Sequence, residues 1–231
     1  MTDEELNLQQ NRLFKTGASL YERRKRSSFN VFLNVVIVFF CVILVLELFF
    51  NLFYMGIYVV NVSMQPTLMG AENENVSGGE FIYVNKYAKP DYGDIVVVYR
   101  EEERYGTVER GNIIKRVVAF GGDTVSMEMG VLYVNGEKVD ESYLNLDDII
   151  DNLAESESAY SFDTHVVKEG CMFLLGDNRN RSTDSRPNRT RSECIDYPAD
   201  NLVGVVPAWS ISVKSFTTGV YTFFNFTLWG K

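Results

Sequence analysis

One long apolar run near the N-terminus constrains this chain more than any other feature. Residues 29–46, FNVFLNVVIVFFCVILVL, carry no charge, and the sequence after Glu47, LFFNLFYMGIYVV, stays uncharged and aromatic. A helix needs about 20 mostly apolar residues to cross a bilayer. The window from Val31 to Phe53 supplies them, and Glu47 lies toward one end, where its charge can reach the interface. We therefore predict one transmembrane helix, with residues 29–58 as an anchor.

The alternative to an anchor is a cleaved signal peptide. Such a peptide has an apolar segment of only about 7–15 residues, followed by small residues. This run is longer and is followed by bulky aromatic residues. The basic cluster RRKR, residues 23–26, precedes it, so the positive-inside rule assigns residues 1–28 to a cytoplasmic tail. Residues 59–231 then form an extracytoplasmic domain of a single-pass cell-membrane protein.

Charge and reactive-residue counts exclude several functions. The net charge of −9, with −10 on residues 61–231, makes nucleic acid an unfavourable partner. The chain has one histidine, His165, in a segment expected to be exposed, and no CxxC spacing, so we predict no metal site. Cys171 and Cys194 are the cysteines outside the apolar run, and the sequence leaves open whether they pair.

Short β-rich runs fill the chain from residue 80 onward. They are rich in Val, Ile, Tyr and Phe and are separated by Gly- and Asp-containing turns, which predicts a mainly β domain of antiparallel strands. Asn135-Gly136 is expected to form a tight hairpin turn. The runs are EFIYVNKY, DIVVVYR, IIKRVVAF, VLYVNGEKV, HVVKEGCMFLLGD and NLVGVVPAW.

Two segments depart from this pattern. Residues 143–158 have apolar residues at helical spacing and lead into an acidic loop, so we predict a small helical and acidic insertion at about 143–165. The C-terminal SFTTGVYTFFNFTLWGK is aromatic and nearly uncharged, and at this length it is too short to span a bilayer as a helix. A final core strand is the favoured interpretation, and an aromatic patch resting on lipid is the alternative.

The octapeptide NVSMQPTL, residues 61–68, directly follows the apolar run. Ser, Pro and Thr favour turns, which is the structural interpretation. The functional interpretation is a serine nucleophile presented beside a membrane. A serine nucleophile needs a base, and a lysine can serve only if burial lowers its pKa. Lys115, with Ile113, Ile114, Val117 and Val118 around it in NIIKRVVAF, is the candidate, although an edge-strand lysine that prevents aggregation has the same pattern.

A third stretch, LLGDNRNRSTDSR at 174–186, is dense in polar residues. It fits either a solvated loop or a buried hydrogen-bond network around a site. With these motifs in place, the chain resembles the bacterial type I signal peptidases, membrane-bound serine proteases with a Ser-Lys dyad. The matching stretches occur in the family's order: SMQPTL (63–68), GDIVVVY (93–99), KRVVAFGGD (115–123), LYVNGEKVDESYL (132–144) and GDNRNRSTDSR (176–186).

The resemblance implies a role for each matching residue. Ser63 would be the nucleophile, Lys115 the general base and Ser182 the residue that orients the lysine. The oxyanion hole would use the Ser63 backbone N–H and Asn61, two residues earlier. The resemblance also implies a structural, non-catalytic role for four charged residues that fall on matching positions of the family: Arg116, Asp177, Asp184 and Arg186. The implied substrate-pocket residues are Val59, Met64, Leu68, Ile113 and Ile114.

The resemblance also implies a function. The expected activity is the removal of N-terminal signal peptides from secreted preproteins, without a cofactor, at the bilayer surface and near the secretion translocase. Ala119-Phe120-Gly121-Gly122-Asp123 lacks the proline usual in the family, which loosens a turn but removes no catalytic group. The alternative is a degenerate anchored β-domain that binds or scaffolds secreted chains, but such a relative would be expected to lose Ser63 or Lys115, and both are present.

Overall fold

A computed structural model describes residues 3–71, 79–104, 107–144, 160–187 and 191–229. The chain divides into two compact units, Met1–Leu52 and Phe53–Lys231, and each is described by itself. The predicted insertion at 143–165 falls mostly on residues 145–159, which lie outside the described residues.

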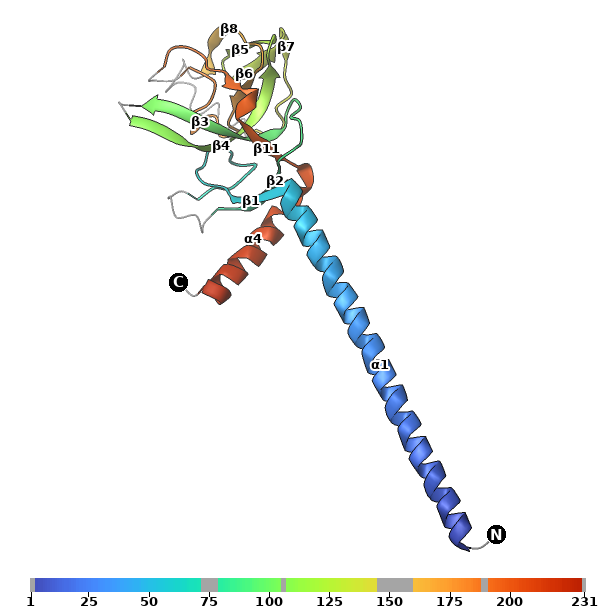
Figure 1. The fold of residues 1–231 in the computed structure, drawn as a ribbon. Coiled ribbons are helices and arrows are strands. Elements are labelled where there is room, and N and C mark those ends of the chain that lie inside the picture. Colours follow the sequence, from blue (N-terminus) through green and yellow to red (C-terminus); the bar gives the residue numbers. More distant parts are fainter. Residues whose placement is uncertain (1–2, 72–78, 105–106, 145–159, 188–190, 230–231) are drawn as a thin grey trace. The chain divides into compact units, whose positions relative to one another are not determined.

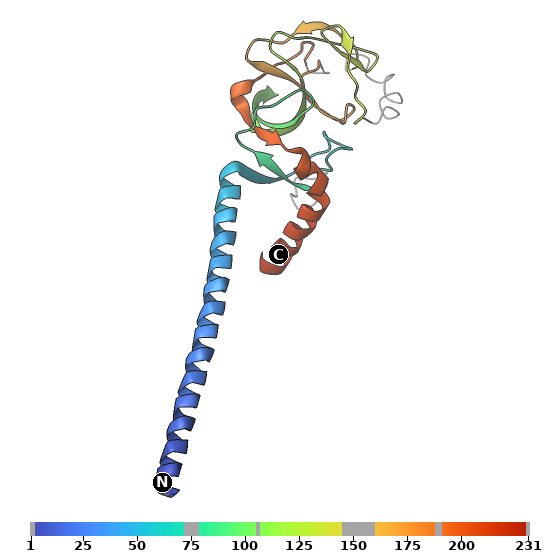
Figure 2. The same ribbon diagram turned by 90° about the vertical axis from the view of Figure 1, so that its right-hand side faces the viewer.

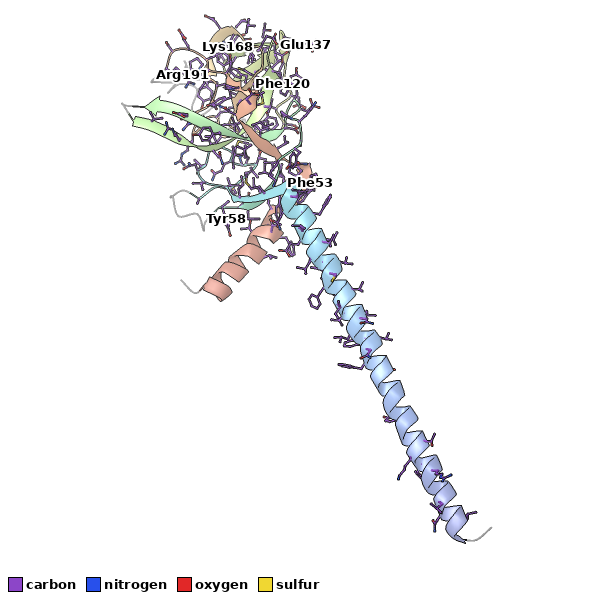
Figure 3. The ribbon with its side chains drawn as sticks, in the orientation of Figure 1. Phe53, Tyr58, Phe120, Glu137, Lys168 and Arg191 are labelled. Carbon is purple, nitrogen blue, oxygen red and sulfur yellow. The ribbon has the colours of Figure 1, made fainter. Side chains whose placement is uncertain are left out.

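The first unit is one helix, α1, Asp3–Phe53. Its segment Ser28–Phe53 is 26 residues long, has a mean hydropathy of 3.0 and buries none of its surface within the protein. Figure 3 shows its apolar side chains projecting outward along the helix. Length and composition therefore suit a membrane span. The helix ends before residue 58: Tyr54–Tyr58 form strand β1 of the second unit instead, so the anchor is shorter than predicted.

The second unit is mainly β, as expected, and contains a seven-stranded and a four-stranded sheet (Figure 1). The larger sheet has the order β1-β2-β11-β3-β4-β9-β10, and each neighbouring pair is antiparallel. Its other strands are β2 (Phe81–Asn85), β3 (Ile95–Arg104), β4 (Thr107–Phe120), β9 (Cys171–Leu175), β10 (Tyr197–Pro198) and β11 (Leu202–Val206). A short 3-10 helix, η3 (Ala199–Asn201), connects β10 and β11.

The smaller sheet has the order β7-β6-β5-β8. Asn135 and Gly136 have φ values of +54° and +80° and join β6 to β7, which confirms the predicted hairpin turn. Asparagine and glycine are the residues that most readily adopt two successive positive φ angles. The strands are β5 (Thr124–Glu128), β6 (Val131–Val134), β7 (Glu137–Lys138) and β8 (Phe162–Val166).

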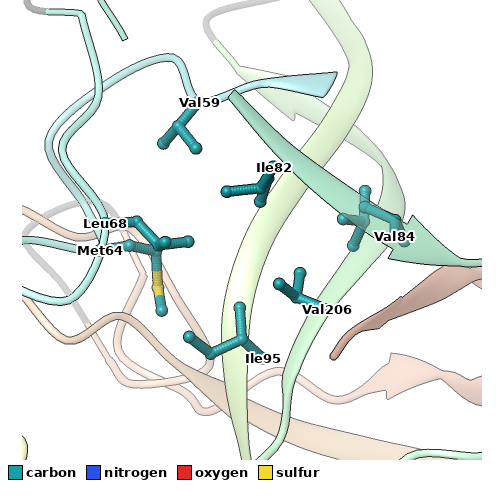
Figure 4. Close-up of a cluster of buried hydrophobic side chains, with 8 residues drawn as sticks. Val59, Met64, Leu68, Ile82, Val84, Ile95 and Val206 are labelled. Atoms are coloured by element: carbon teal, nitrogen blue, oxygen red, sulfur yellow. The ribbon is translucent and has the colours of Figure 1, made fainter. Parts of the chain in front are cut away.

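Three clusters of buried apolar side chains form the core of the second unit. The cluster beside β1 and β2 gathers around one interior space (Figure 4). We call it the β2 core, and it consists of Val59, Met64, Leu68, Ile82, Val84, Ile95, Val97 and Val206. The first three of these residues flank Ser63 in sequence, so burial of its neighbours fixes the segment that carries this serine.

The C-terminal tail corrects the prediction of a final strand. Residues Ala208–Trp229 form a helix, α4, that packs on β2 (Figure 2). Hydroxyl groups on α4 take the place of a neighbouring strand: Ser210 Oγ accepts the Tyr83 N–H, and Thr218 Oγ1 accepts the Phe81 N–H. Thr217 donates to the Phe81 carbonyl. These contacts are tertiary, so the periodicity of the tail alone does not reveal them.

The cysteines and the histidine also have defined settings. Cys171 and Cys194 are free thiols that pack against the same apolar cluster. Burial raises the pKa of the Cys194 thiol to about 11, which disfavours the reactive thiolate. His165 is half-buried and lies 2.8 Å from an Asp196 carboxylate oxygen, so it is less exposed than expected.

Candidate active site

Ser63 lies in a closed loop, residues 60–71, that we call the Ser63 loop. A bridge between Val60 and Ala71 and a 3.0 Å hydrogen bond from the Asn61 N–H to the Ala71 carbonyl join its two ends. The ends approach so closely that a Cβ on Gly70 would lie 1.7 Å from the Asn61 carbonyl oxygen. Buried Met64 and Leu68 hold the inner side of the loop, which leaves Ser63 half-buried.

Lys115 reaches the serine from β4. Its Nζ lies 2.8 Å from Ser63 Oγ and donates a 2.9 Å hydrogen bond to the Ile114 carbonyl. The residue is 4% exposed. Desolvation lowers the pKa of Lys115 to about 8, against a smaller opposing effect of Asp184. An amine with this pKa is uncharged in an appreciable fraction of molecules near neutral pH, so it can accept a proton from the hydroxyl.

The next residue, Arg116, is held in a different way. Its guanidinium makes two hydrogen bonds to Asp177, of 2.9 and 2.6 Å, and a third of 2.7 Å to the Gly93 carbonyl. It also lies 3.9 Å from the centre of the Tyr143 ring. This bidentate pair ties β4 to the segment after β9, the polar stretch at 176–186.

Asp184 and Arg186 form a second buried pair in that segment. Arg186 Nε lies 2.9 Å from Asp184 Oδ1, and Asp184 Oδ2 accepts the Gly176 N–H at 3.1 Å. The Arg186 guanidinium contributes to a lowered pKa for Asp184, although burial works in the opposite direction as the largest single effect. Both residues are at most 3% exposed, so the stretch is a buried network and not a solvated loop.

This network holds the Ser63 loop through Asn178, for which the sequence predicted no individual role. The Asn178 backbone N–H donates to the Ser63 carbonyl at 3.0 Å, and its side-chain amide donates to the Val62 carbonyl at 3.1 Å. Gly176 lies beside them, where a Cβ would be 2.6 Å from the Ser63 carbonyl oxygen. The position of Asn178 in the GDNRN motif was the available signal, but only the fold shows which backbone groups it reaches.

Ser182 lies close to this contact. A Cβ on Gly176 would be 2.1 Å from its Oγ. The Ser182 Oγ is buried, and its hydrogen bonding to Asp184 helps to lower the pKa of that carboxyl. The expected bond from Ser182 to Lys115 is not formed here, and its orienting role stays a prediction.

The Ser63 backbone N–H and Asn61 are the two groups expected to form an oxyanion hole. Among the described residues, no acceptor is recorded for the Ser63 backbone N–H. Asn61 is exposed and has a φ of +70°, a conformation that asparagine tolerates better than most residues. Its side chain lines the same cleft as Ser63.

A cleft of about 390 Å³ opens over Ser63 and Lys115. Its walls come from β1, the Ser63 loop and the paired strands β3 and β4, and tyrosine and asparagine add polar groups to an otherwise aliphatic lining. The lining residues are Ile57, Tyr58, Val60, Asn61, Ser63, Val97, Asn112, Ile113, Ile114 and Lys115.

The predicted pocket residues divide into two groups. Ile113 and Ile114 line the cleft. Val59, Met64 and Leu68 are at most 1% exposed in the β2 core and are not among the residues that line this cleft, so their pocket role stays a prediction. Ile57 and Ile114 pack against this core, so the three buried side chains support the wall of the cleft from behind.

The sequence did not identify the contribution of β1 and β3 to the lining. Val97 lies opposite Ile114 in the β3–β4 register, so knowledge of strand pairing would have placed both on one wall. His165 is engaged with Asp196 and is not a partner of Ser63. Within the described ranges, no group of three or more His, Cys, Asp or Glu side chains is placed to hold a metal ion.

The chain is similar to known proteins in sequence. The family model described as signal peptidase, peptidase S26, matches residues 32–212. The chain is 36% identical over 148 residues to a signal peptidase I of Bacillus licheniformis, covering 62% of this chain and 72% of that protein. It is 30% identical over 151 residues to the chloroplastic thylakoidal processing peptidase 1 of Arabidopsis thaliana, covering 63% of this chain and 38% of that protein.

Among solved structures, the chain is similar to a signal peptidase I from Enterococcus faecalis V583. The two are 27% identical with a TM-score of 0.40, and the match covers 52% of this chain and 98% of the other.

Proposed function

The chain belongs to the signal peptidase family, peptidase S26, and we propose that Ser63 and Lys115 are the dyad by which it works. Membership makes it a serine peptidase that removes signal peptides from preproteins. The observation that carries the assignment is the 2.8 Å separation between Lys115 Nζ and Ser63 Oγ, with Lys115 only 4% exposed.

In the first step the neutral Lys115 amine accepts the Ser63 hydroxyl proton while Oγ attacks the carbonyl carbon before the scissile bond. The resulting tetrahedral intermediate collapses, the peptide C–N bond breaks, and the proton on Lys115 passes to the leaving amine. The mature protein departs and the signal peptide remains as an acyl ester on Ser63. Water, deprotonated by the same lysine, then hydrolyses the ester.

The Ser63 backbone N–H is the proposed oxyanion donor, with the Asn61 amide as its partner. A preorganised donor of this kind is worth roughly 3 kcal/mol in the transition state. Among the described residues the Ser63 N–H has no acceptor, which supports its role, and the place of Asn61 in the cleft supports its own. We further propose that Ser182 accepts a hydrogen bond from the lysine amine during the reaction, because its buried Oγ lies in the polar network that contains Asp184.

The aliphatic part of the cleft, including Ile113 and Ile114, would accept the small residues that precede a signal-peptide cleavage site. This aliphatic part of the cleft would favour small apolar side chains over charged ones, because a charge would lose hydration against it.

The lipid bilayer is the proposed environment of this reaction. Ser28–Phe53 of α1 would span the cell membrane once, with the RRKR cluster in the cytoplasm and the catalytic unit outside, beside the secretion translocase. On α4, Trp209, Val213 and Phe216 are exposed at helical spacing and would rest against the lipid interface. Confining enzyme and substrate to one surface raises their effective concentration.

The test uses the full chain in detergent micelles and a precursor peptide with alanine at −1 and −3. Ser63→Ala should lower cleavage at least roughly a thousandfold, because the nucleophile acts together with its base. Ser126→Ala, on β5 of the smaller sheet, is the matched control and should cleave normally. Full cleavage by Ser63→Ala would overturn the dyad and favour a different nucleophile.

A further inference from the structure

A second lysine contacts the Ser63 loop at a different position from Lys115. Lys214, on α4, donates a 2.6 Å hydrogen bond from Nζ to the Thr67 carbonyl and lies 2.9 Å from Glu80 Oε2. Its side chain is 19% exposed and that of Glu80 is 16% exposed. The pair is therefore mostly withdrawn from solvent, where an ion pair is screened less than at the surface.

Glu80 completes the contact with the loop. Its Oε2 accepts the Met69 N–H at 2.8 Å, and its own N–H donates to the Met69 carbonyl at 2.9 Å. Lys214 and Glu80 together thus engage three backbone groups of the loop, at Thr67 and Met69. These contacts are outside the cleft, because neither Lys214 nor Glu80 lines it.

Helix α4, which carries Lys214, is itself attached to β2. Ser210, Thr217 and Thr218 bond α4 to the backbone of β2 on both sides of Lys214 in sequence. Glu80 directly precedes β2, whose strand pairs with β1, and β1 leads into the Ser63 loop. The lysine therefore extends from a helix attached to the same sheet that carries the loop.

Catalysis requires that the loop stay in place, because Ser63 Oγ must remain within reach of Lys115. A displacement of about 1 Å can lower a rate by roughly a hundredfold. Asn178 holds the loop at Ser63 and Val62, and the Lys214–Glu80 pair holds it four to six residues further on. Hydrogen bonds thus hold the loop both at Ser63 and again near Thr67 and Met69.

We propose that Lys214, paired with Glu80, is a positioning residue that keeps Ser63 in register with Lys115. This inference rests on the proposed dyad and extends its supporting shell to the C-terminal helix. Lys214 does not act as a base, because the Ser63 hydroxyl contacts Lys115 and the Lys214 ammonium is committed to a carboxylate and a carbonyl.

The test is steady-state kinetics of the full chain in micelles, with the alanine-containing precursor peptide. Lys214→Met should lower kcat roughly 10- to 100-fold, because the nucleophile is less often in place. KM should change little, and the pH midpoint of the rate should stay where Lys115 sets it. Lys214→Arg retains donors for Thr67 and Glu80 and should recover most of the rate. Lys168→Met, an exposed lysine on the segment before β9, is the charge-matched control and should match the wild type.

Thermal melting of each variant separates positioning from unfolding. A wild-type kcat for Lys214→Met, or a loss accounted for by the unfolded fraction at the assay temperature, would overturn the proposal. If Lys214→Met does not fold, Glu80→Gln provides the same comparison, since it removes the charge and preserves the shape. An inactive Ser63→Ala together with an unimpaired Lys214→Met would reject this inference alone, whereas an active Ser63→Ala would reject the dyad itself.

Discussion

Lys115 and Arg116 are consecutive residues on β4, and their cationic groups lie in opposite chemical settings. The amine of Lys115 contacts a hydroxyl and a carbonyl, and among the described residues no carboxylate is in ion-pair contact with it. The guanidinium of Arg116 is matched by both oxygens of Asp177. Strand β4 therefore carries a base without a carboxylate counter-ion among the described residues, Lys115, next to a cation that has one, Arg116.

The difference separates reactivity from support. Burial without a counter-ion disfavours the charged form of an amine. This cost lowers the stability of the folded chain at neutral pH, but it makes the amine available as a base. A buried pair makes little net contribution to stability, yet removing one partner leaves an uncompensated charge. Three experiments test this contrast, from the largest expected effect to the smallest.

The first experiment replaces Lys115 by methionine. Cleavage of the precursor peptide should fall at least roughly a thousandfold, because the base is gone. The folded chain should become more stable at pH 7, by up to about 3 kcal/mol, since burial holds the Lys115 pKa at about 8 instead of its ordinary 10.5. Denaturant unfolding measures this gain.

The size of the gain depends on pH. Below pH 8 the lysine is protonated in both states and the cost of burying its charge is fully present. Between about pH 8 and 10.5 the folded chain loses its proton first, so the wild type gains stability and the advantage of methionine should fade. A methionine variant less stable than the wild type at pH 7 would contradict this account of the amine.

Lys115→Arg should be inactive as well, because its guanidinium stays charged.

The second experiment breaks the neighbouring pair with Asp177→Asn. The free energy of unfolding should fall by about 3–5 kcal/mol, because Arg116 keeps its charge at a side-chain exposure of 11%. The matched control is Glu101→Gln in the exposed Glu101–Arg110 pair, whose side chains are 50% and 63% exposed. This control should leave the free energy of unfolding nearly unchanged, because solvent screens the exposed pair. Equal losses in the two variants would remove the distinction between buried and exposed pairs.

The third experiment measures kcat/KM of the wild type against pH. The rate should rise about tenfold for each pH unit below 8 and level off above it, as Lys115 loses its proton. A profile that is flat from pH 6 to 9 would show that the ionisation of Lys115 does not control the rate.

Local sequence patterns predicted much of this molecule. The apolar run predicted α1, the six β-rich runs each contain a strand, and Asn135-Gly136 predicted its turn. The aliphatic residues around Lys115 correctly indicated a buried lysine. Each of these features depends mainly on residues close in the chain, so they were accessible without a fold.

The errors concern features that depend on partners distant in the chain. Tyr54–Tyr58 were expected in the anchor because the local sequence does not reveal that they pair with β2. The tail was expected to be a strand because the local sequence does not reveal that its hydroxyl groups bond to the backbone of β2. Met64 and Leu68 share the motif of Ser63, yet the core takes up their side chains. Family roles transfer to backbone positions more safely than to the direction in which a side chain points.

The hydroxyl contacts between α4 and β2 have a practical consequence for anyone who shortens this enzyme for study. A version that stops before residue 208 would leave the Phe81 and Tyr83 amides of β2 without Thr218 and Ser210, the acceptors they have here. An open strand border of this kind recruits strands from other molecules, so such a version would tend to self-associate in solution.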